Sequence, residues 1–382
     1  MKFLHTADWH LGKIVHQKSM IEDQAYILDE LLEIIKKDKI KVLIIAGDVY
    51  DRFIPSVEAM KVLDQFLSKA ISDFKLTIFM IAGNHDQGSR LDFVSNIVDA
   101  SGLYIAGSAT KKCKKITLSD EFGPLNFYLL PFFKPSFVKY ECEADDVVDF
   151  NSAMKQYLSF QDIDYSERNV LITHQFVAGK FAVIESESEM PLSVGGSSQI
   201  GVDVFDGFDY VALGHLHAPQ AIEKETIRYS GSILKYSLDE AFHKKSISIV
   251  NIKEKNNINI QTIPLIPLRD VKIIKGYFSD IIHNHQPSLD YVGIELLDET
   301  MVFDAMERIR SIYPNALAIN YTNNKQSETM ELNNVHLEHV KDPLTIFTDF
   351  YTSSVGQEPT DEILNVFKDV VESAKDKENE TH

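Results

Sequence analysis

The strongest constraint on this chain is a recurring pattern, in which short apolar runs end in residue types that bind metals. In the segment LTIFMIAGNHDQGSRLD, the β-branched and aromatic run Thr77–Ile81 predicts a buried strand. Gly83 stops the run, and Asn84 and His85 follow at once. We expect Gly83 to let the backbone turn sharply, so that the next side chains leave the strand end pointing into solvent. Asn84 then offers a neutral oxygen and His85 an imidazole.

Four further apolar runs end in the same way, in TADWH, GDVYD, a lone histidine and GHLH. Each motif alone is weak, since Asp-x-His often arises by chance and a His-x-His pair can simply face solvent. In layered α/β folds, strand ends of the same sense converge on one edge of the sheet. The ordered set therefore predicts one pocket of seven donors, namely Asp8, His10, Asp48, Asn84, His174, His215 and His217.

These donor types predict a centre with two divalent metal ions. Only Asp8 and Asp48 carry formal charge, so two ions sharing a carboxylate would leave positive charge to receive a phosphate. Imidazole mixed with carboxylate, without cysteine, fits manganese, iron or zinc better than calcium. His5 and His16 have no such pattern around them and are interpreted as ordinary polar residues.

Composition limits how the chain can bind nucleic acid and where it works. The net charge of −19 argues against binding by bulk electrostatics, so contact with nucleic acid would need a local basic patch, metals or a partner. Two cysteines, Cys113 and Cys142, are too few for a disulfide framework. Neither a signal peptide nor a membrane-spanning run is evident. We expect a cytoplasmic protein that does not associate with a membrane.

Apolar periodicity predicts an α/β domain over residues 1–265. The expected helices are Ile21–Lys37, Val57–Ile71 and Arg90–Ser101, and the expected strands are Lys2–His5, Val42–Ala46, Thr77–Ile81, Leu125–Leu130, Asn169–Thr173 and Tyr210–Leu213.

A proline-containing connector, Ile263–Val271, predicts the end of this domain. Residues 266–330 are predicted to form a small α/β domain, and residues 331–382 an acidic tail with a frayed end. The expected elements are strands at Val271–Ile274 and Tyr291–Leu296, a helix at Val302–Ile312, and tail helices at Asp342–Ser353 and Thr360–Ser373.

The ordered motifs resemble those of the calcineurin-like metallophosphoesterases. HTADWHLG, IIAGDVYD, IAGNHD, ESESEMPLSVGG, FDGFDYVALGHLH, YSGSILKYSLDE and PLIPLRDV resemble, within that family, the DNA nuclease subunits that pair with an SbcC-type ATPase. The resemblance covers about Met1–Val271 and continues more weakly beyond it; Met190 departs from it, since a basic residue is expected there. It implies a four-layer α-β-β-α sandwich, a small α/β capping domain and a helical C-terminal tail.

The resemblance also implies a role for each donor. Asp48 would bridge two ions, with manganese as the usual metal; His85 would protonate the leaving oxygen or stabilise the transition state. Asp51 would orient His85 or a metal ligand, although a turn-capping aspartate is an equally simple interpretation. One ion would be held by Asp8, His10, Asp48 and His217, and the other by Asp48, Asn84, His174 and His215.

The implied function is metal-dependent hydrolysis of DNA in repair, recombination and replication. It comprises 3′–5′ exonuclease activity on double-stranded DNA, single-strand endonuclease activity and hairpin opening, in a heterotetramer of two nuclease and two SbcC-type subunits. One alternative is a stand-alone esterase for small nucleotides or phosphodiesters, which would not need a capping domain and tail. Another is an inactive scaffold, against which the complete donor set argues.

Two protein contacts are also implied. The nuclease subunits would form a homodimer through the helices at Val57–Ile71 and Arg90–Ser101, with Val62, Phe66, Phe93 and Ile97 in contact, unless all four face their own core. The tail would dock on the coiled-coil base of the ATPase through Phe347, Phe350, Phe367 and Val371, unless it folds back onto the small domain.

Overall fold

The computed structural model describes residues 1–189, 198–283 and 286–322, with the separate positions 347, 348, 351, 359, 360, 363, 364 and 367. The chain divides into two compact units, Met1–Leu296 with Val302–Asn320, and Leu297–Met301 with Tyr321–His382. The two large sheets and the candidate site lie in the first unit. The predicted boundaries at residues 265 and 330 stay a prediction, and Met190 lies outside the described residues.

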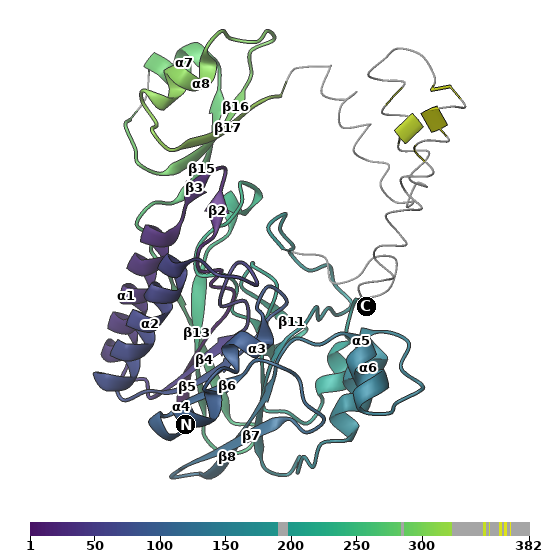
Figure 1. The fold of residues 1–382 in the computed structure, drawn as a ribbon. Helices are drawn as coiled ribbons and strands as arrows, with labels where there is room; N and C mark the ends of the chain where they lie inside the picture. Colours follow the sequence, from purple (N-terminus) through teal and green to yellow (C-terminus); the bar gives the residue numbers. More distant parts are fainter. Residues whose placement is uncertain are drawn as a thin grey trace. The chain divides into compact units, whose positions relative to one another are not determined.

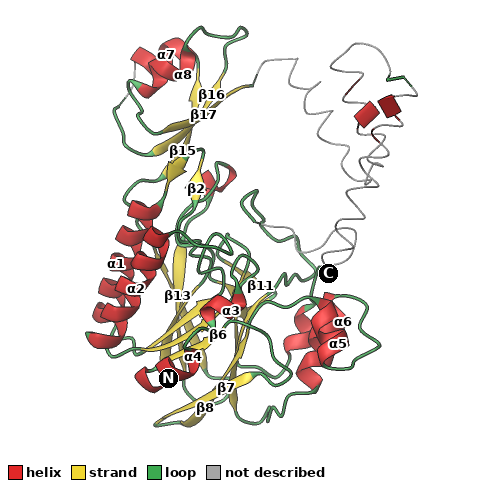
Figure 2. Ribbon diagram, viewed as in Figure 1, coloured by secondary structure: helices red, strands yellow, loops and turns green. Residues whose placement is uncertain are grey.

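Two six-stranded sheets form the centre of the first unit (Figure 1, Figure 2). The first has the order β14-β13-β1-β4-β5-β6 and the second β11-β12-β10-β9-β8-β7. In the first, β1, β4, β5 and β6 run parallel, as do β8, β9, β10 and β12 in the second. The strands are β1 (Lys2–Thr6), β4 (Val42–Ala46), β5 (Thr77–Ile81), β6 (Leu103–Ala106), β7 (Lys114–Asp120), β8 (Gly123–Leu130), β9 (Arg168–His174), β10 (Tyr210–Gly214), β11 (Gln220–Ile222), β12 (Lys224–Tyr229), β13 (Ser246–Ile252) and β14 (Ile258–Pro264).

Alternation along the strands gives each sheet two buried faces. Phe79 and Phe127 belong to the core between the sheets, where their ring centroids lie 4.5 Å apart. On the outer face of the first sheet, Leu43 packs in the core that contains α1 (Ile21–Lys37) and α2 (Val57–Ser72). On the outer face of the second, Leu171 packs with α5 (Pro135–Glu141) and α6 (Phe150–Ser159). This order of layers confirms the predicted α-β-β-α sandwich.

The predicted continuous helix Arg90–Ser101 is wrong. The segment forms α3 (Gly88–Leu91), α4 (Ser95–Val98) and a short 3-10 helix, and it breaks at Val94, whose φ is 59°. The Asp92 carboxylate accepts hydrogen bonds from the backbone N–H groups of Gly107 (2.6 Å) and Ser108 (2.9 Å). These bonds to the loop after β6 hold the chain in a path that one straight helix cannot follow.

The C-terminal part of the first unit is a three-stranded sheet in the order β15-β16-β17. The predicted helix Val302–Ile312 is shorter, because Asp304 has a φ of 50° and α8 begins only after it. The Arg269 guanidinium pairs with both Asp23 carboxylate oxygens on α1, at 2.9 and 2.8 Å, and so ties the connector to α1. The elements are β15 (Val271–Gly276), α7 (Phe278–His283), β16 (Tyr291–Leu296), α8 (Ala305–Arg310) and β17 (Ala316–Tyr321), with a small ribbon of β2 (Ile14–Val15) and β3 (Lys18–Ser19) earlier in the chain.

The predicted tail helices fall largely outside the described residues, as do Phe350 and Val371. Of the described positions there, Phe347 and Phe367 stack with ring centroids 4.1 Å apart. Among the described residues, no helix has the length and apolar character needed to cross a membrane.

Candidate metal centre

The five predicted strand ends meet at one place, but they come from two sheets rather than one. The ends of β1, β4 and β5 carry Asp8, His10, Asp48 and Asn84, and the ends of β9 and β10 carry His174, His215 and His217. All seven side chains are buried, so the expectation that the side chain of Asn84 points into solvent after Gly83 is wrong. The seven donors are buried where the edges of the two sheets meet.

The backbone around the donors is forced into unusual conformations. Asp8, His10, Asp48 and His215 have φ values of 53°, 45°, 48° and 117°, which non-glycine residues adopt only when their surroundings hold them. The restraints are direct: Asp8 N–H donates to the Gly47 carbonyl at 3.0 Å, and His215 N–H donates to the Asp8 carboxylate at 3.0 Å. The two sheets therefore fix each other's donors.

Gly83 is needed for space rather than for a sharp turn. A Cβ at this position would lie 2.1 Å from Asp48 Oδ1. A Cβ on Gly214, before the GHLH histidines, would lie 1.9 Å from the Ala46 carbonyl oxygen. Gly83 thus lets the ends of the neighbouring strands β4 and β5 approach closely, and Gly214 lets the end of β10 in the second sheet approach the end of β4 in the first.

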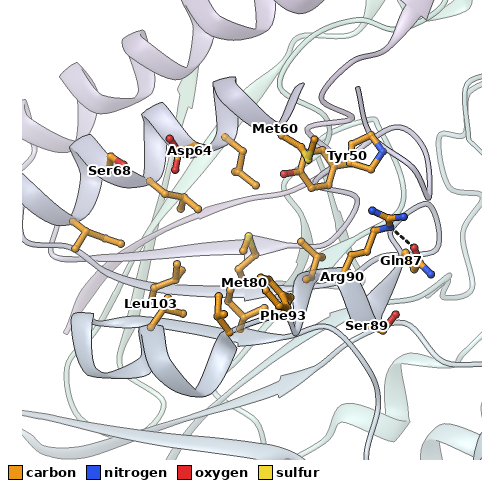
Figure 3. Close-up of a pocket in the computed structure, with 18 of the residues that line it drawn as sticks. Tyr50, Met60, Asp64, Ser68, Met80, Gln87, Ser89, Arg90, Phe93 and Leu103 are labelled. Atoms are coloured by element: carbon orange, nitrogen blue, oxygen red, sulfur yellow. Dashed lines mark hydrogen bonds between the residues drawn. The ribbon is translucent and has the colours of Figure 1, made fainter. Parts of the chain in front are cut away.

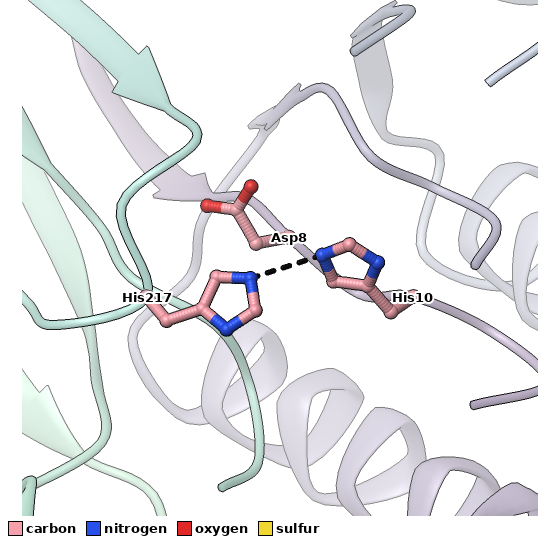
Figure 4. A group of neighbouring side chains, drawn as sticks. All are labelled: Asp8, His10 and His217. Atoms are coloured by element: carbon pink, nitrogen blue, oxygen red, sulfur yellow. Dashed lines mark hydrogen bonds between the residues drawn. The ribbon is translucent and has the colours of Figure 1, made fainter. Parts of the chain in front are cut away.

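One group of donors is formed by Asp8, His10 and His217 (Figure 4). The Nε2 atoms of His10 and His217 face each other at 3.0 Å. His217 Nδ1 lies 2.9 Å from a carboxylate oxygen of Glu240, so we place its proton on Nδ1. The lone pair of His217 Nε2 is then directed toward His10, as a metal ligand requires.

A second group surrounds the side-chain oxygen of Asn84. Asn84 Oδ1 lies 3.0 Å from His174 Nε2 and 3.3 Å from His215 Nδ1. Asp48 Oδ2 lies 3.4 Å from the same His174 Nε2 and 3.6 Å from His10 Nε2 in the first group. A single carboxylate oxygen therefore lies within 3.6 Å of an imidazole nitrogen of each group.

The electrostatics of the site favour a cation. Burial alone would lower the pKa of His174, but the carboxylates of Asp48 and Asp8 outweigh burial and raise it to about 9. Burial alone would raise the pKa of Asp48, but His174 holds it well below its usual range. Burial lowers the pKa of His217 to about 4. The carboxylates thus draw a positive charge onto His174, and a divalent cation would displace that proton.

His85 lies at the rim of the site and is only half-buried. Its backbone N–H donates to Asp48 Oδ1 at 2.9 Å, and its ring centroid lies 4.8 Å from that of His10. His85 Nδ1 lies 3.0 Å from the backbone carbonyl oxygen of Asp51. The Asp51 carboxylate instead lies 2.9 Å from Lys13 Nζ. His85, Asp51 and His10 could geometrically form another metal group, but the Lys13 ammonium already balances the Asp51 charge there.

Sequence reasoning missed the residues that hold His217 in place. Glu240 is fully buried; its carboxylate accepts hydrogen bonds from the Ser188 hydroxyl and from Lys245 Nζ (2.6 Å), and lies beside His217 Nδ1. The backbone N–H of His217 donates to Glu189 Oε1 at 2.6 Å. These acidic residues lie in the ESESEM and SLDE segments that carry the family resemblance, which was the available signal.

His5 was also misjudged, because it is a core residue rather than an ordinary polar one. It is completely buried, and its Nδ1 lies 3.0 Å from the Tyr210 hydroxyl. Burial lowers its pKa to about 3. His5 therefore stays neutral inside the sandwich.

An apolar cavity of about 770 Å³ lies between α2 and the α3–α4 segment. Figure 3 shows Met60 on one side and Phe93 on the other. Phe93 and Ile97 are exposed, whereas Phe66 is buried with its ring centroid 5.1 Å from that of Trp9, and Val62 is half-buried against the core. The prediction that all four residues make the dimer contact is therefore wrong for Phe66, and the alternative that all four face the core is wrong for Phe93 and Ile97.

Two sheets packed between helices, with buried carboxylates and imidazoles at their joined edges, define a metallophosphoesterase-type sandwich. Residues 1–219 match the calcineurin-like phosphoesterase family, and residues 267–354 match the family described as the type 5 capsule protein repressor C-terminal domain. The chain belongs to the calcineurin-like phosphoesterase family. It is 35% identical over 370 residues to the SbcD subunit of the SbcCD nuclease from Staphylococcus saprophyticus subsp. saprophyticus, and the match covers 94% of this chain and 95% of that protein.

Proposed function

We propose that this chain is the nuclease subunit of an SbcCD-type complex and hydrolyses phosphodiester bonds in DNA with two divalent metal ions. The observation that carries the proposal is the Asp48 oxygen lying 3.6 and 3.4 Å from imidazole nitrogens of two separate donor groups. Similarity to the SbcD subunit of the SbcCD nuclease over nearly the whole chain supports DNA as the substrate.

The donor set fits two such ions, and we propose Mn²⁺. When bound, a metal pair supplies an activated water and neutralises charge on the phosphoryl group. Asp48 would bridge the ions, and Gly83 leaves room for its carboxylate. Asp8, His10, Asp48 and His217 would hold one ion, and Asp48, Asn84, His174 and His215 the other.

His85 is assigned to proton transfer rather than to metal binding. Its Nδ1 faces the Asp51 carbonyl, which can only accept, so Nδ1 carries a proton; when the ring is an imidazolium, Nε2 carries a second proton, which it would deliver to the leaving oxygen while the ring becomes neutral. Asp51 would thus orient His85 through its backbone, while its carboxylate faces Lys13 and His10. Burial would raise the pKa of Asp51, but His10 and Lys13 outweigh it and lower the pKa to about 2, so the carboxylate stays charged.

We further propose a homodimer, and a heterotetramer with two SbcC-type ATPase subunits acting on double-stranded and hairpin DNA in the cytoplasm. The exposed side chains of Val57, Met60, Phe93 and Ile97 support an apolar contact at α2 and α4. The predicted tail anchors would bind the ATPase. Removing residues after Asn333 should then abolish association with the ATPase but keep hydrolysis of a small phosphodiester.

The deciding experiment compares the rates at which different substrates are hydrolysed. It uses protein that has been stripped of metal and reloaded with Mn²⁺. We expect cleavage of bis-p-nitrophenyl phosphate by the chain alone, and of hairpin and double-stranded DNA with the ATPase partner. Asp48→Asn, which removes the bridging charge, should abolish all of these activities. Hydrolysis of small nucleotides without any cleavage of DNA, even with the ATPase present, would favour the stand-alone esterase instead.

A further inference from the structure

A second cavity, of about 620 Å³, opens directly beside the candidate metal centre. The two share a wall, since the cavity is lined by Asn84 and by the Ala82 and Gly83 backbone that leads to it. Several of the other lining residues are aromatic. We call this cavity the aromatic cleft and define it by Phe53, Phe132, Phe137 and Lys134.

The walls of the aromatic cleft are fixed relative to the metal centre. The Phe132 N–H donates to the Ala82 carbonyl at 2.9 Å, which ties the aromatic wall to the loop that carries Asn84. On the other side, Gly88 and Gly107 approach so closely that a Cβ on Gly88 would lie 2.4 Å from the Gly107 carbonyl oxygen. A ligand in the cleft would therefore hold a defined position beside the reacting phosphate.

The chemistry of the cleft matches a nucleotide. Phe53 is 58% exposed, and Phe132 and Phe137 are half-buried, so aromatic surface is available for stacking. Lys134 is exposed, and its ammonium makes no hydrogen bond or ion pair within the part of the chain that the structure describes. Stacking on aromatic rings beside a lysine is the usual way of binding single-stranded nucleic acid. A chain of net charge −19 needs such local contacts, because its overall field repels phosphates.

We propose that the aromatic cleft binds an unpaired base next to the phosphate at the metal centre. This inference rests on the proposed nuclease function and narrows its substrate class. A base inside a duplex is stacked on its neighbours and cannot enter the cleft without leaving the helix. Double-stranded DNA would therefore have to unpair locally before one of its bases could occupy the aromatic cleft.

The test measures binding of fluorescently labelled oligothymidylate to the full-length protein by anisotropy, with Ca²⁺ in place of Mn²⁺. The double variant Phe53→Ala with Phe132→Ala should bind roughly 5- to 150-fold more weakly, the range expected for one lost stacking contact. Phe122→Ala, in the turn between β7 and β8 outside the cleft, is the matched control and should bind like the parent protein. Unchanged Mn²⁺ binding and melting temperature would show that the double variant is folded.

An abasic oligonucleotide of equal length separates base binding from phosphate binding. The parent protein and the double variant should bind it equally, whereas Lys134→Ala should weaken both oligonucleotides alike. Equal loss on both oligonucleotides in the double variant, or no loss on either, would overturn the base-binding role. If the parent protein with its ATPase partner cleaved no DNA at all, that result would refute the proposed nuclease function. It would do so independently of what the aromatic cleft binds.

Discussion

Replacing Glu240 by glutamine should weaken one of the two proposed metal sites and leave the other intact. Glu240 lies 2.9 Å from His217 Nδ1, accepts from Lys245 Nζ at 2.6 Å, and accepts from the Tyr236 N–H at 3.2 Å. Burial would raise its pKa, but Lys245 and His217 outweigh burial and hold the pKa far below the usual range. The carboxylate is therefore charged and fixes the His217 ring with Nε2 toward His10.

The size of the effect follows from these contacts. Removing a carboxylate that orients a metal-binding histidine typically costs about 10- to 100-fold in metal affinity. Breaking a buried ion pair by removing one partner costs about 3–5 kcal/mol of folding stability. Lys245 keeps hydrogen bonds to the His217 carbonyl and the Ser232 hydroxyl, both at 2.8 Å, so we expect about the lower value of 3 kcal/mol.

Calorimetric titration of metal-stripped Glu240→Gln with Mn²⁺ gives the readout. One binding event should weaken and the other should keep its affinity, because Glu240 is hydrogen-bonded to His217 of the first donor group, whereas the second group is built around Asn84, His174 and His215. Urea unfolding in EDTA measures the stability loss separately, and Glu187→Gln, an exposed neighbour, is the control. Two binding events of unchanged affinity in Glu240→Gln would refute the orienting role.

Three further predictions test other parts of the structure. His85→Ala should keep both Mn²⁺ ions in calorimetry but lose about 10²–10⁴-fold in hydrolysis, the usual worth of a general acid; loss of the ions would mean that His85 is a ligand. Ile97→Asp should stay folded and become monomeric in light scattering, because Ile97 is 74% exposed, whereas Phe66→Asp should unfold; a folded dimer of Ile97→Asp would place the interface elsewhere. The pKa of His5 is lowered to about 3, below the unfolded value of 6.5, so its neutral form supports the fold fully above pH 6.5 and progressively less as pH falls. The loss of folding free energy should reach about 2 kcal/mol at pH 5, as measured by urea unfolding with EDTA. His5→Gln should flatten this dependence of stability on pH. An equal dependence on pH in both proteins would contradict the assignment to His5.

The sequence by itself determined the local elements and the identity of the donors. Helix α1 and strands β4, β5 and β16 have the predicted bounds, because apolar spacing and β-branched runs act over a few residues. The seven donors could be named because each follows an apolar run, and that relation is also local. Their assignment to two metal ions depended on the family resemblance and stays a proposal.

Only the tertiary structure decided what each donor faces. His215 and His217 are two residues apart, yet one turns to Asn84 and the other to His10, because the chain after β10 bends at His215 and meets β1 and β5 from the other sheet. The sequence does not identify Glu240 as the partner of His217, because nothing in a sequence distinguishes an exposed glutamate from one buried beside a histidine. The break at Val94 and the burial of Phe66 likewise follow from contacts between distant residues, which override local periodicity.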